Sequence, residues 1–360
     1  MNKQQTIIVG VLFLFVFLSV GLFLMRDQKT PKSEMNFDKN LDIGKQTVKD
    51  EVSEKTEDTI TGAMKNGEVP SFTLRLLAVK KFDGRDLVFG EVQEKNTSYT
   101  RYYVTYTGGE LTLSGIMNVP TSTPPEGGFP VLILAHGHID TSIYTNGRGL
   151  RREQDYLAKQ GFVVFHPDYR NHAQSTKTDE DPLEERLGYV EDVVNAIYAL
   201  RGSSLEYIDK ENIGIMGHSM GGGIAETIMV TFPDLVKGFV LYAPVSMDYR
   251  DSYERWMKER PETEEQIRRI YGAPEENPDF WNAISATAYV DRINQAVQIH
   301  HGTRDEDVPI EWSQETYELL QSKGKNVEYF VYQGEGHEFA SQWPIFMERT
   351  SSFFHSRFGK

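Results

Sequence analysis

A serine between two glycines, in the pentapeptide Gly217-His218-Ser219-Met220-Gly221, is the residue of this chain best suited to nucleophilic chemistry. It follows the apolar run Asn212–Met216 and precedes a glycine-rich segment of helical character. A sharp strand-to-helix turn holds such a serine in a strained backbone conformation, and glycines on both sides let the turn close. The spacing therefore predicts a nucleophile elbow with the Ser219 hydroxyl exposed at its tip.

Two later segments carry the partners that a serine nucleophile needs. Asp305 lies in a turn after an apolar segment, and His337 lies in a glycine-flanked loop after the next one. A neutral imidazole takes the serine proton, and a carboxylate orients the imidazole and stabilises its charged form. The chain order serine, acid, histidine is that of α/β-hydrolases. Glu306 and Asp307 are neighbouring alternatives for the acid.

The tetrahedral intermediate of acyl transfer needs two hydrogen-bond donors aimed at its oxygen. The backbone amide of Met220 is the expected first donor. The loop after the apolar segment Val131–Ala135 should supply the second, which we assign to the amide of His138, with the Tyr144 hydroxyl as a further candidate. The spacing of His136 and His138 could bind a metal, but no set of carboxylate ligands accompanies it, so neither a metal nor a cofactor is expected.

Several other stretches form a more specific pattern. Because of them, the chain from about Phe72 to its end resembles the catalytic domain of prolyl oligopeptidase-type serine peptidases, which belong to the α/β-hydrolase superfamily. The resemblance implies that fold and a triad of Ser219, Asp305 and His337, in agreement with the chain order. The stretches are Gly161–Arg170, Asp209–Met216, Tyr271–Pro278, Val290–Ile293 and His301-Gly302-x-x-Asp305-x-x-Val308-Pro309.

Three features depart from the family pattern. Asn171 stands where the family usually has Gly, and Ala296 replaces the Pro expected before the acid-bearing strand. The largest departure is size, because one blade of a β-propeller takes roughly 40 to 45 residues. Only about 60 residues separate the N-terminal polar segment from the core strands, too few for a propeller that selects substrates by length. We therefore expect a compact hydrolase.

After Pro130, short apolar runs alternate with helical stretches, which predicts a mostly parallel sheet with helices on both faces. Four earlier segments separated by turns predict antiparallel strands. The predicted strands are Phe72–Val79, Leu87–Gln93, Arg101–Thr107, Leu111–Val119, Val131–Ala135, Phe162–His166, Ile213–Gly217, Phe239–Tyr242, Val297–His301 and Val327–Tyr332. The predicted helices are Arg148–Gln160, Glu184–Arg201, Gly222–Phe232, Ile310–Ser322 and Ser341–Phe354.

Residues 246–294 interrupt this alternation with a long segment rich in aromatic residues. Insertions at the carboxyl ends of strands overhang the active site in this kind of fold, so we predict a helical lid. We expect Trp256 or Trp281 to contact the substrate. The alternative is that these aromatic side chains only pack the insert against the body of the domain.

The N-terminus carries a run of nineteen uncharged residues, Ile7–Met25, long enough to cross a bilayer as a helix. No small-x-small cleavage site follows it, so residues 1–26 are expected to form an uncleaved single-pass anchor. Residues 27–70 are rich in charged and polar side chains and are expected to be a disordered tether to the catalytic domain, residues 71–360. We expect that domain on the extracytoplasmic side, because long folded domains translocate largely regardless of charge.

The composition narrows the function further. A net formal charge of −15 argues against a nucleic-acid partner, and the absence of cysteine excludes a thiol nucleophile. The sequence predicts a membrane-tethered serine hydrolase that cleaves an amide or ester bond of a peptide or small-molecule substrate through an acyl-enzyme. The alternatives are a carboxylesterase or acyl esterase acting on small or carbohydrate-linked esters, and a catalytically silent binding module of the cell envelope.

Overall fold

A computed structural model describes residues 73–359 of the chain. The predicted anchor, residues 1–26, and the predicted tether, residues 27–70, lie outside the described residues. Within the described range, every helix is too short or too polar to traverse a lipid bilayer.

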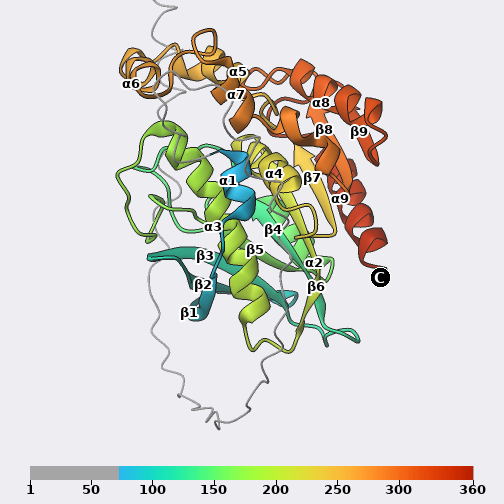
Figure 1. Cartoon of the computed structure of the whole chain (residues 1–360). Helices are drawn as coiled ribbons and strands as arrows, with labels where there is room; N and C mark the ends of the chain where they lie inside the picture. The colour runs from blue at the N-terminus through green and yellow to red at the C-terminus, as the bar shows by residue number, and fades with distance from the viewer. Residues whose placement is uncertain (1–72, 360) are drawn as a thin grey trace, which may run out of the picture. The chain divides into compact units, whose positions relative to one another are not determined.

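The strands of the described chain form one mixed sheet (Figure 1). They are β1 (Arg85–Lys95), β2 (Tyr99–Gly108), β3 (Leu111–Pro120), β4 (Phe129–Ala135), β5 (Val163–Pro167), β6 (Ile208–His218), β7 (Gly238–Tyr242), β8 (Ala296–Gly302) and β9 (Val327–Tyr332). Their order is β1-β2-β3-β5-β4-β6-β7-β8-β9. The strands β1, β2, β3 and β5 pair antiparallel in that order, whereas β5, β4, β6, β7, β8 and β9 pair parallel. This arrangement confirms the predicted fold class.

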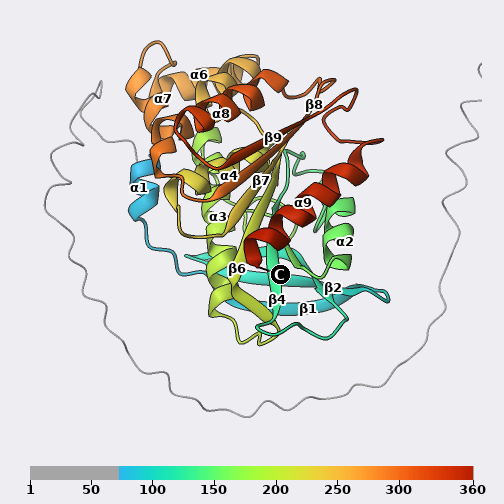
Figure 2. The same cartoon turned by 90° about the vertical axis from the view of Figure 1, so that its right-hand side faces the viewer.

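Helices cover both faces of the sheet, as the uninterrupted apolar runs predict. Along β4, Val131 and Ile133 face one hydrophobic core, while Leu132 and Leu134 face the other. The first core includes residues of α3 (Pro182–Gly202), α4 (Met220–Thr231) and α8 (Ile310–Ser322). The second includes residues of α2 (Arg151–Lys159) and α9 (Trp343–Phe358), which Figure 2 shows together on one side of the sheet.

One predicted strand is wrong, because the segment predicted as Phe72–Val79 contains the short helix α1 (Leu74–Val79). Thr73 caps this helix, and its hydroxyl oxygen accepts a hydrogen bond from the Leu76 amide at 3.3 Å. Leu74 and Leu77, one helical turn apart, are its buried side chains. A single helical turn gives only a short apolar pattern, and the residues of this segment also suit a strand. The pattern therefore predicts a strand where the structure has a helix.

The predicted insertion between β7 and β8 is helical. It contains α5 (Tyr249–Ser252), a π-helical turn (Tyr253–Met257), α6 (Pro261–Tyr271), α7 (Pro278–Ile284) and a 3-10 segment (Ala286–Arg292). We call residues 246–294 the helical insert.

The carboxyl ends of the parallel strands meet at one edge of the sheet. The register pairs Ala135 of β4 with Gly217 of β6, and His218 of β6 with Tyr242 of β7. Tyr242 is in turn aligned with His300 of β8. The loops that follow these strands therefore start side by side, which brings distant parts of the chain to one site.

Candidate active site

Ser219 occupies a sharp turn between β6, which ends at His218, and α4, which begins at Met220. Its backbone angles are φ 56° and ψ −121°, a conformation that residues with side chains rarely adopt. A Cβ on Gly217 would lie 2.2 Å from the Gly221 carbonyl oxygen, and one on Gly221 would lie 2.0 Å from the Ala135 carbonyl oxygen. Glycine is therefore required on both sides of the serine, and the turn has the geometry of a nucleophile elbow.

Asp305 and His337 come from the loops after β8 and β9 and bond directly. The Nδ1 atom of His337 lies 2.8 Å from Oδ2 of Asp305, whose side chain is fully buried. The same oxygen lies 3.0 Å from Nε2 of His301, and the other accepts the Val308 amide at 2.9 Å. Burial alone would raise the pKa of Asp305, but the hydrogen bonds from His301 and His337 outweigh it and hold the pKa well below its usual range.

Burial and hydrogen bonding distinguish Asp305 from its two neighbours in sequence, which were the alternatives for the acid. Glu306 and Asp307 are exposed, whereas the Asp305 carboxylate is enclosed and paired with the imidazole of His337. The arrangement meets the requirement for a carboxylate that orients a histidine.

Two residues that the sequence analysis did not single out support the loop that carries His337. Burial lowers the pKa of His218 to about 3, so its ring is neutral. Its Nε2 atom donates to the His337 carbonyl oxygen at 3.1 Å, and the two ring centroids are 4.5 Å apart. The Tyr242 hydroxyl accepts the Phe339 amide at 2.6 Å. His218 ends β6 and Tyr242 ends β7, so both residues lie beside the nucleophile elbow. The pentapeptide and the apolar pattern of β7 are the sequence signals that could have identified them.

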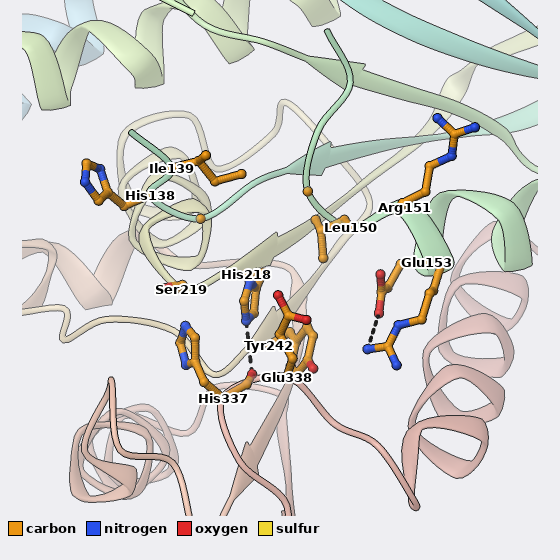
Figure 3. A pocket seen from close by; sticks show the side chains of 13 residues that line it. His138, Ile139, Leu150, Arg151, Glu153, His218, Ser219, Tyr242, His337 and Glu338 are labelled. Carbon is orange, nitrogen blue, oxygen red and sulfur yellow. Dashed lines mark hydrogen bonds and ion pairs between the residues drawn. The ribbon is translucent and has the colours of Figure 1, made fainter. Parts of the chain in front are cut away.

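A cavity of about 310 Å³ contains Ser219 and His337 on its wall (Figure 3). His138, from the loop after β4, lines the same cavity. A Cβ on Gly137 would lie 3.1 Å from Cβ of Ser219, so this loop runs directly against the elbow. Met220 is the first residue of α4, where a backbone amide has no acceptor within its helix. The structure thus brings both predicted oxyanion donors to the neighbourhood of Ser219.

Tyr144, the further donor candidate, and the predicted substrate contacts Trp256 and Trp281 do not line this cavity. Tyr144 is buried, and its hydroxyl donates to Oδ1 of Asp168 at 2.8 Å. Trp281 is fully buried inside the helical insert, where its Nε1 donates to the Gly272 carbonyl at 3.0 Å. Trp256 meets Trp312 edge to face at 5.4 Å, on the wall of a second cavity beside Asp307. These side chains are therefore engaged away from the cavity in this structure, and a role for them in binding the substrate stays a prediction.

Asp168, immediately after β5, explains the position of Tyr144. Its Oδ1 also accepts the Gly147 amide at 2.8 Å, and its Oδ2 accepts the Asn146 amide group and the Ser114 hydroxyl, each at 2.6 Å. Three of these four donors lie in residues 136–150, which we call the wall loop. One buried carboxylate therefore fastens the loop that borders Ser219.

The departure at Asn171 is explained by its backbone. Its φ of 67° lies in the left-handed region, where glycine is favoured and asparagine is the best tolerated alternative. Asn171 therefore adopts a backbone conformation that glycine would adopt without strain.

Among the described residues, Asp305, Asp307 and His337 have ligating atoms within 4.8 Å of one another and could hold a metal ion. Asp305 and His337 already form a hydrogen bond with each other. This pair explains why two of the three residues lie close together. His136 is not part of it, because its ring is buried and stacked on Tyr169 at 4.2 Å.

Comparison with known proteins identifies the family. Residues 148–360 match the model of the prolyl oligopeptidase family. The uncharacterized peptidase YtmA of Bacillus subtilis (strain 168) is 27% identical over 239 residues, which cover 66% of this chain and 86% of that protein. The probable dipeptidyl peptidase 4 of Aspergillus clavatus is 27% identical over 206 residues, which cover 55% of this chain and only 25% of that protein.

Solved structures share the fold. The acetyl xylan esterase from Paenibacillus sp. R4 has a TM-score of 0.60 at 20% identity, covering 79% of this chain and 92% of the esterase. The acylaminoacyl peptidase of Pyrococcus horikoshii has a TM-score of 0.57 at 20% identity, covering 72% of this chain and 42% of the peptidase. The chain belongs to the prolyl oligopeptidase family and is a serine hydrolase, either a peptidase or an esterase.

Proposed function

We propose that this chain hydrolyses an ester or amide bond through an acyl-enzyme formed on Ser219. His337 takes the serine proton as general base, and Asp305 orients the imidazole and stabilises its charged form. The observation that carries the proposal is the bonded pair of Asp305 and His337, placed so that His337 and the strained Ser219 line one cavity.

In the first step, Oγ of Ser219 bonds to the carbonyl carbon while its proton passes to His337. The negative oxygen of the intermediate receives hydrogen bonds from the amides of Met220 and His138. The bond to the leaving group then breaks, and His337 gives its proton to the departing oxygen or nitrogen. Water repeats the sequence on the acyl-enzyme and releases the acid.

Family membership favours a peptide substrate, and the size of the cavity favours a small ester. A cavity of about 310 Å³ is at the lower end of the usual range for ligand sites, roughly 300 to 1,000 Å³. Comparing rates on short-chain chromogenic esters with rates on aminoacyl and prolyl anilides separates the two substrate classes.

A fluorophosphonate probe tests the mechanism directly. We expect it to label the wild-type protein and not Ser219→Ala, and we expect that variant to lose roughly 10⁴-fold or more in kcat. Ser142→Ala, an exposed serine of the wall loop, is the matched control and should label normally. Absence of labelling in the wild type would support the silent binding module instead.

We also propose that residues 1–26 anchor the enzyme in a membrane, with residues 27–70 as the tether. The support is the uncharged run Ile7–Met25. The full-length chain should sediment with membranes and resist extraction by high salt, whereas a chain starting at residue 71 should not. Recovery of the full-length chain in the supernatant would refute the anchor.

A further inference from the structure

Leu150 adopts an unusual backbone conformation next to the cavity that contains Ser219. Its φ of 52° and ψ of 27° place it in the left-handed region, directly before α2. The residue before a helix is commonly one whose side chain accepts a hydrogen bond from a free amide, and Leu150 makes no such cap. Glycine or asparagine would adopt these angles with less strain, so the local backbone does not explain a leucine here.

The side chain of Leu150 lies at the wall of the cavity. It is partly buried, packs against the core beneath α2 and α9, and lines the cavity together with Ser219 (Figure 3). Its carbonyl oxygen accepts the Gln154 amide at 2.8 Å, which fixes it to the first turn of the helix. The strained residue therefore holds an apolar group at a fixed place in the wall.

The surroundings of the cavity indicate which part of a substrate it receives. Its lining includes His337, the adjacent Glu338, His218 and Tyr242, together with residues 137–139 of the wall loop. None of the residues that line it belongs to the helical insert. Because the imidazole must protonate the departing atom, the leaving group lies on the imidazole side of Ser219.

We propose that this cavity is the leaving-group site and that Leu150 closes it, so that the enzyme accepts esters of small alcohols while the acyl side is less restricted. The inference rests on the proposed function. In the step concerned, the bond between the carbonyl carbon and the alcohol oxygen breaks. The proton that His337 took from Ser219 passes to that oxygen, and the free alcohol must fit against Leu150.

Two ester series test the proposal with Leu150→Ala and Leu150→Gly. In the first series the acyl group is acetate and the alcohol grows from ethanol to octanol. In the second the alcohol is ethanol and the acyl group grows from acetate to octanoate. Leu76→Ala, at an exposed leucine of α1, is the control and should leave both profiles unchanged.

We expect both Leu150 variants to raise kcat/KM for the larger alcohols about tenfold relative to ethanol, and to leave the acyl profile unchanged within about twofold. We also expect a higher Tm for Leu150→Gly than for Leu150→Ala, because glycine relieves the left-handed strain and alanine retains it. That difference in Tm separates the backbone effect from the change in selectivity.

A change confined to the acyl series, or unchanged profiles in variants that fold and still react with fluorophosphonate, would overturn the proposal alone. A wild-type protein that neither reacts with the probe nor turns over any ester would overturn the proposed function and this inference with it.

Discussion

The wall loop, residues 136–150, and the helical insert, residues 246–294, both follow the carboxyl end of a parallel strand and differ in how they are held. The wall loop contains no helix or strand and is fastened by polar groups to the buried carboxylate of Asp168. The insert is helical and packs its aromatic side chains against one another. Residues of the wall loop line the cavity beside Ser219, whereas residues of the insert do not.

The insert meets the catalytic machinery from outside the cavity. Arg255 donates to the carbonyl oxygens of Glu306 at 3.0 Å and Asp307 at 2.9 Å, in the loop that carries Asp305. Its own interior is closed by Trp281 against Tyr253, with ring centroids 5.0 Å apart. The comparison teaches that aromatic content alone does not mark a substrate contact, because a small helical unit needs the same side chains for its own core.

Among the variants that compare the two regions, the largest effect is expected from Asp168→Ala, which removes the anchor of the wall loop. Four donors would lose their bond to Asp168: Tyr144 and Gly147, and also Ser114 and Asn146, which keep a second partner in Ser175 and the Gly115 carbonyl. We expect the free energy of unfolding to fall by about 4 kcal/mol, because each buried donor left unpaired costs roughly 1 to 3 kcal/mol before water enters. We expect kcat/KM to fall about 100-fold from misplacement of the loop, measured with short-chain esters.

Asp248→Ala is the matched control in the helical insert. Asp248 caps α5 by accepting the Arg250 amide at 3.0 Å, so its loss should lower the free energy of unfolding by about 1 kcal/mol. Its kcat/KM should equal that of the wild type. Equal losses of kcat/KM in Asp168→Ala and Asp248→Ala would contradict the conclusion that the wall loop, and not the helical insert, supports the cavity beside Ser219.

Trp281→Ala should create a cavity in the hydrophobic core of the helical insert. A fully buried tryptophan replaced by alanine typically lowers the free energy of unfolding by about 3 to 5 kcal/mol, and we expect about 3 kcal/mol here. Activity per folded molecule should change less than threefold, because Trp281 does not reach the cavity. Chemical denaturation and active-site titration measure the two quantities, and a changed ester preference would restore Trp281 as a substrate contact.

Acid should weaken the wall loop through a buried histidine, a residue type that the insert does not contain. Burial lowers the pKa of His136, in the wall loop, to about 3, compared with about 6.5 in an unfolded chain. The unfolded chain therefore binds a proton that the folded chain does not. The stability contributed by the neutral ring is complete above pH 6.5 or so and is lost progressively as the pH falls towards 3.

His136→Phe keeps a ring in this place and removes the titration. Between pH 7 and pH 4, the wild type should lose up to about 3 kcal/mol more unfolding free energy than the variant. Parallel stability curves across this range would contradict the contribution of His136.

The smallest effect is expected from Trp256→Ala. Trp256 is only partly buried and contacts Trp312 near the surface. Its loss should lower the free energy of unfolding by less than about 1 kcal/mol, and the ranking of esters by kcat/KM should stay the same. A changed ranking would show that the insert closes over the site in solution.

Much of the fold could be predicted because its signals are local. Every predicted strand after residue 80 overlaps an observed one, and every predicted helix overlaps an observed helix. The chain order of Ser219, Asp305 and His337 was sufficient to predict the pairing of the last two. Each of these residues directly follows a recognisable strand.

The features that the sequence did not predict depend on contacts that no local pattern encodes. Tyr144 bonds to a carboxylate 24 positions away, which becomes its neighbour only when β5 pairs beside β4. Trp281 has the same neighbours in sequence whether it faces a substrate or its own helices. The helix at Leu74–Val79 is only 6 residues long, too short for its period to be distinguished from alternation.

The hydrogen bond between His218 and the His337 carbonyl has a consequence for motion. The residue adjoining the nucleophile in sequence holds the main chain of the base, so a displacement of one carries the other with it. Thermal fluctuation of the surrounding loops should therefore change the entrance of the site more than the separation of the reacting atoms. On warming, the enzyme should lose selectivity among substrates before it loses the ability to form the acyl-enzyme.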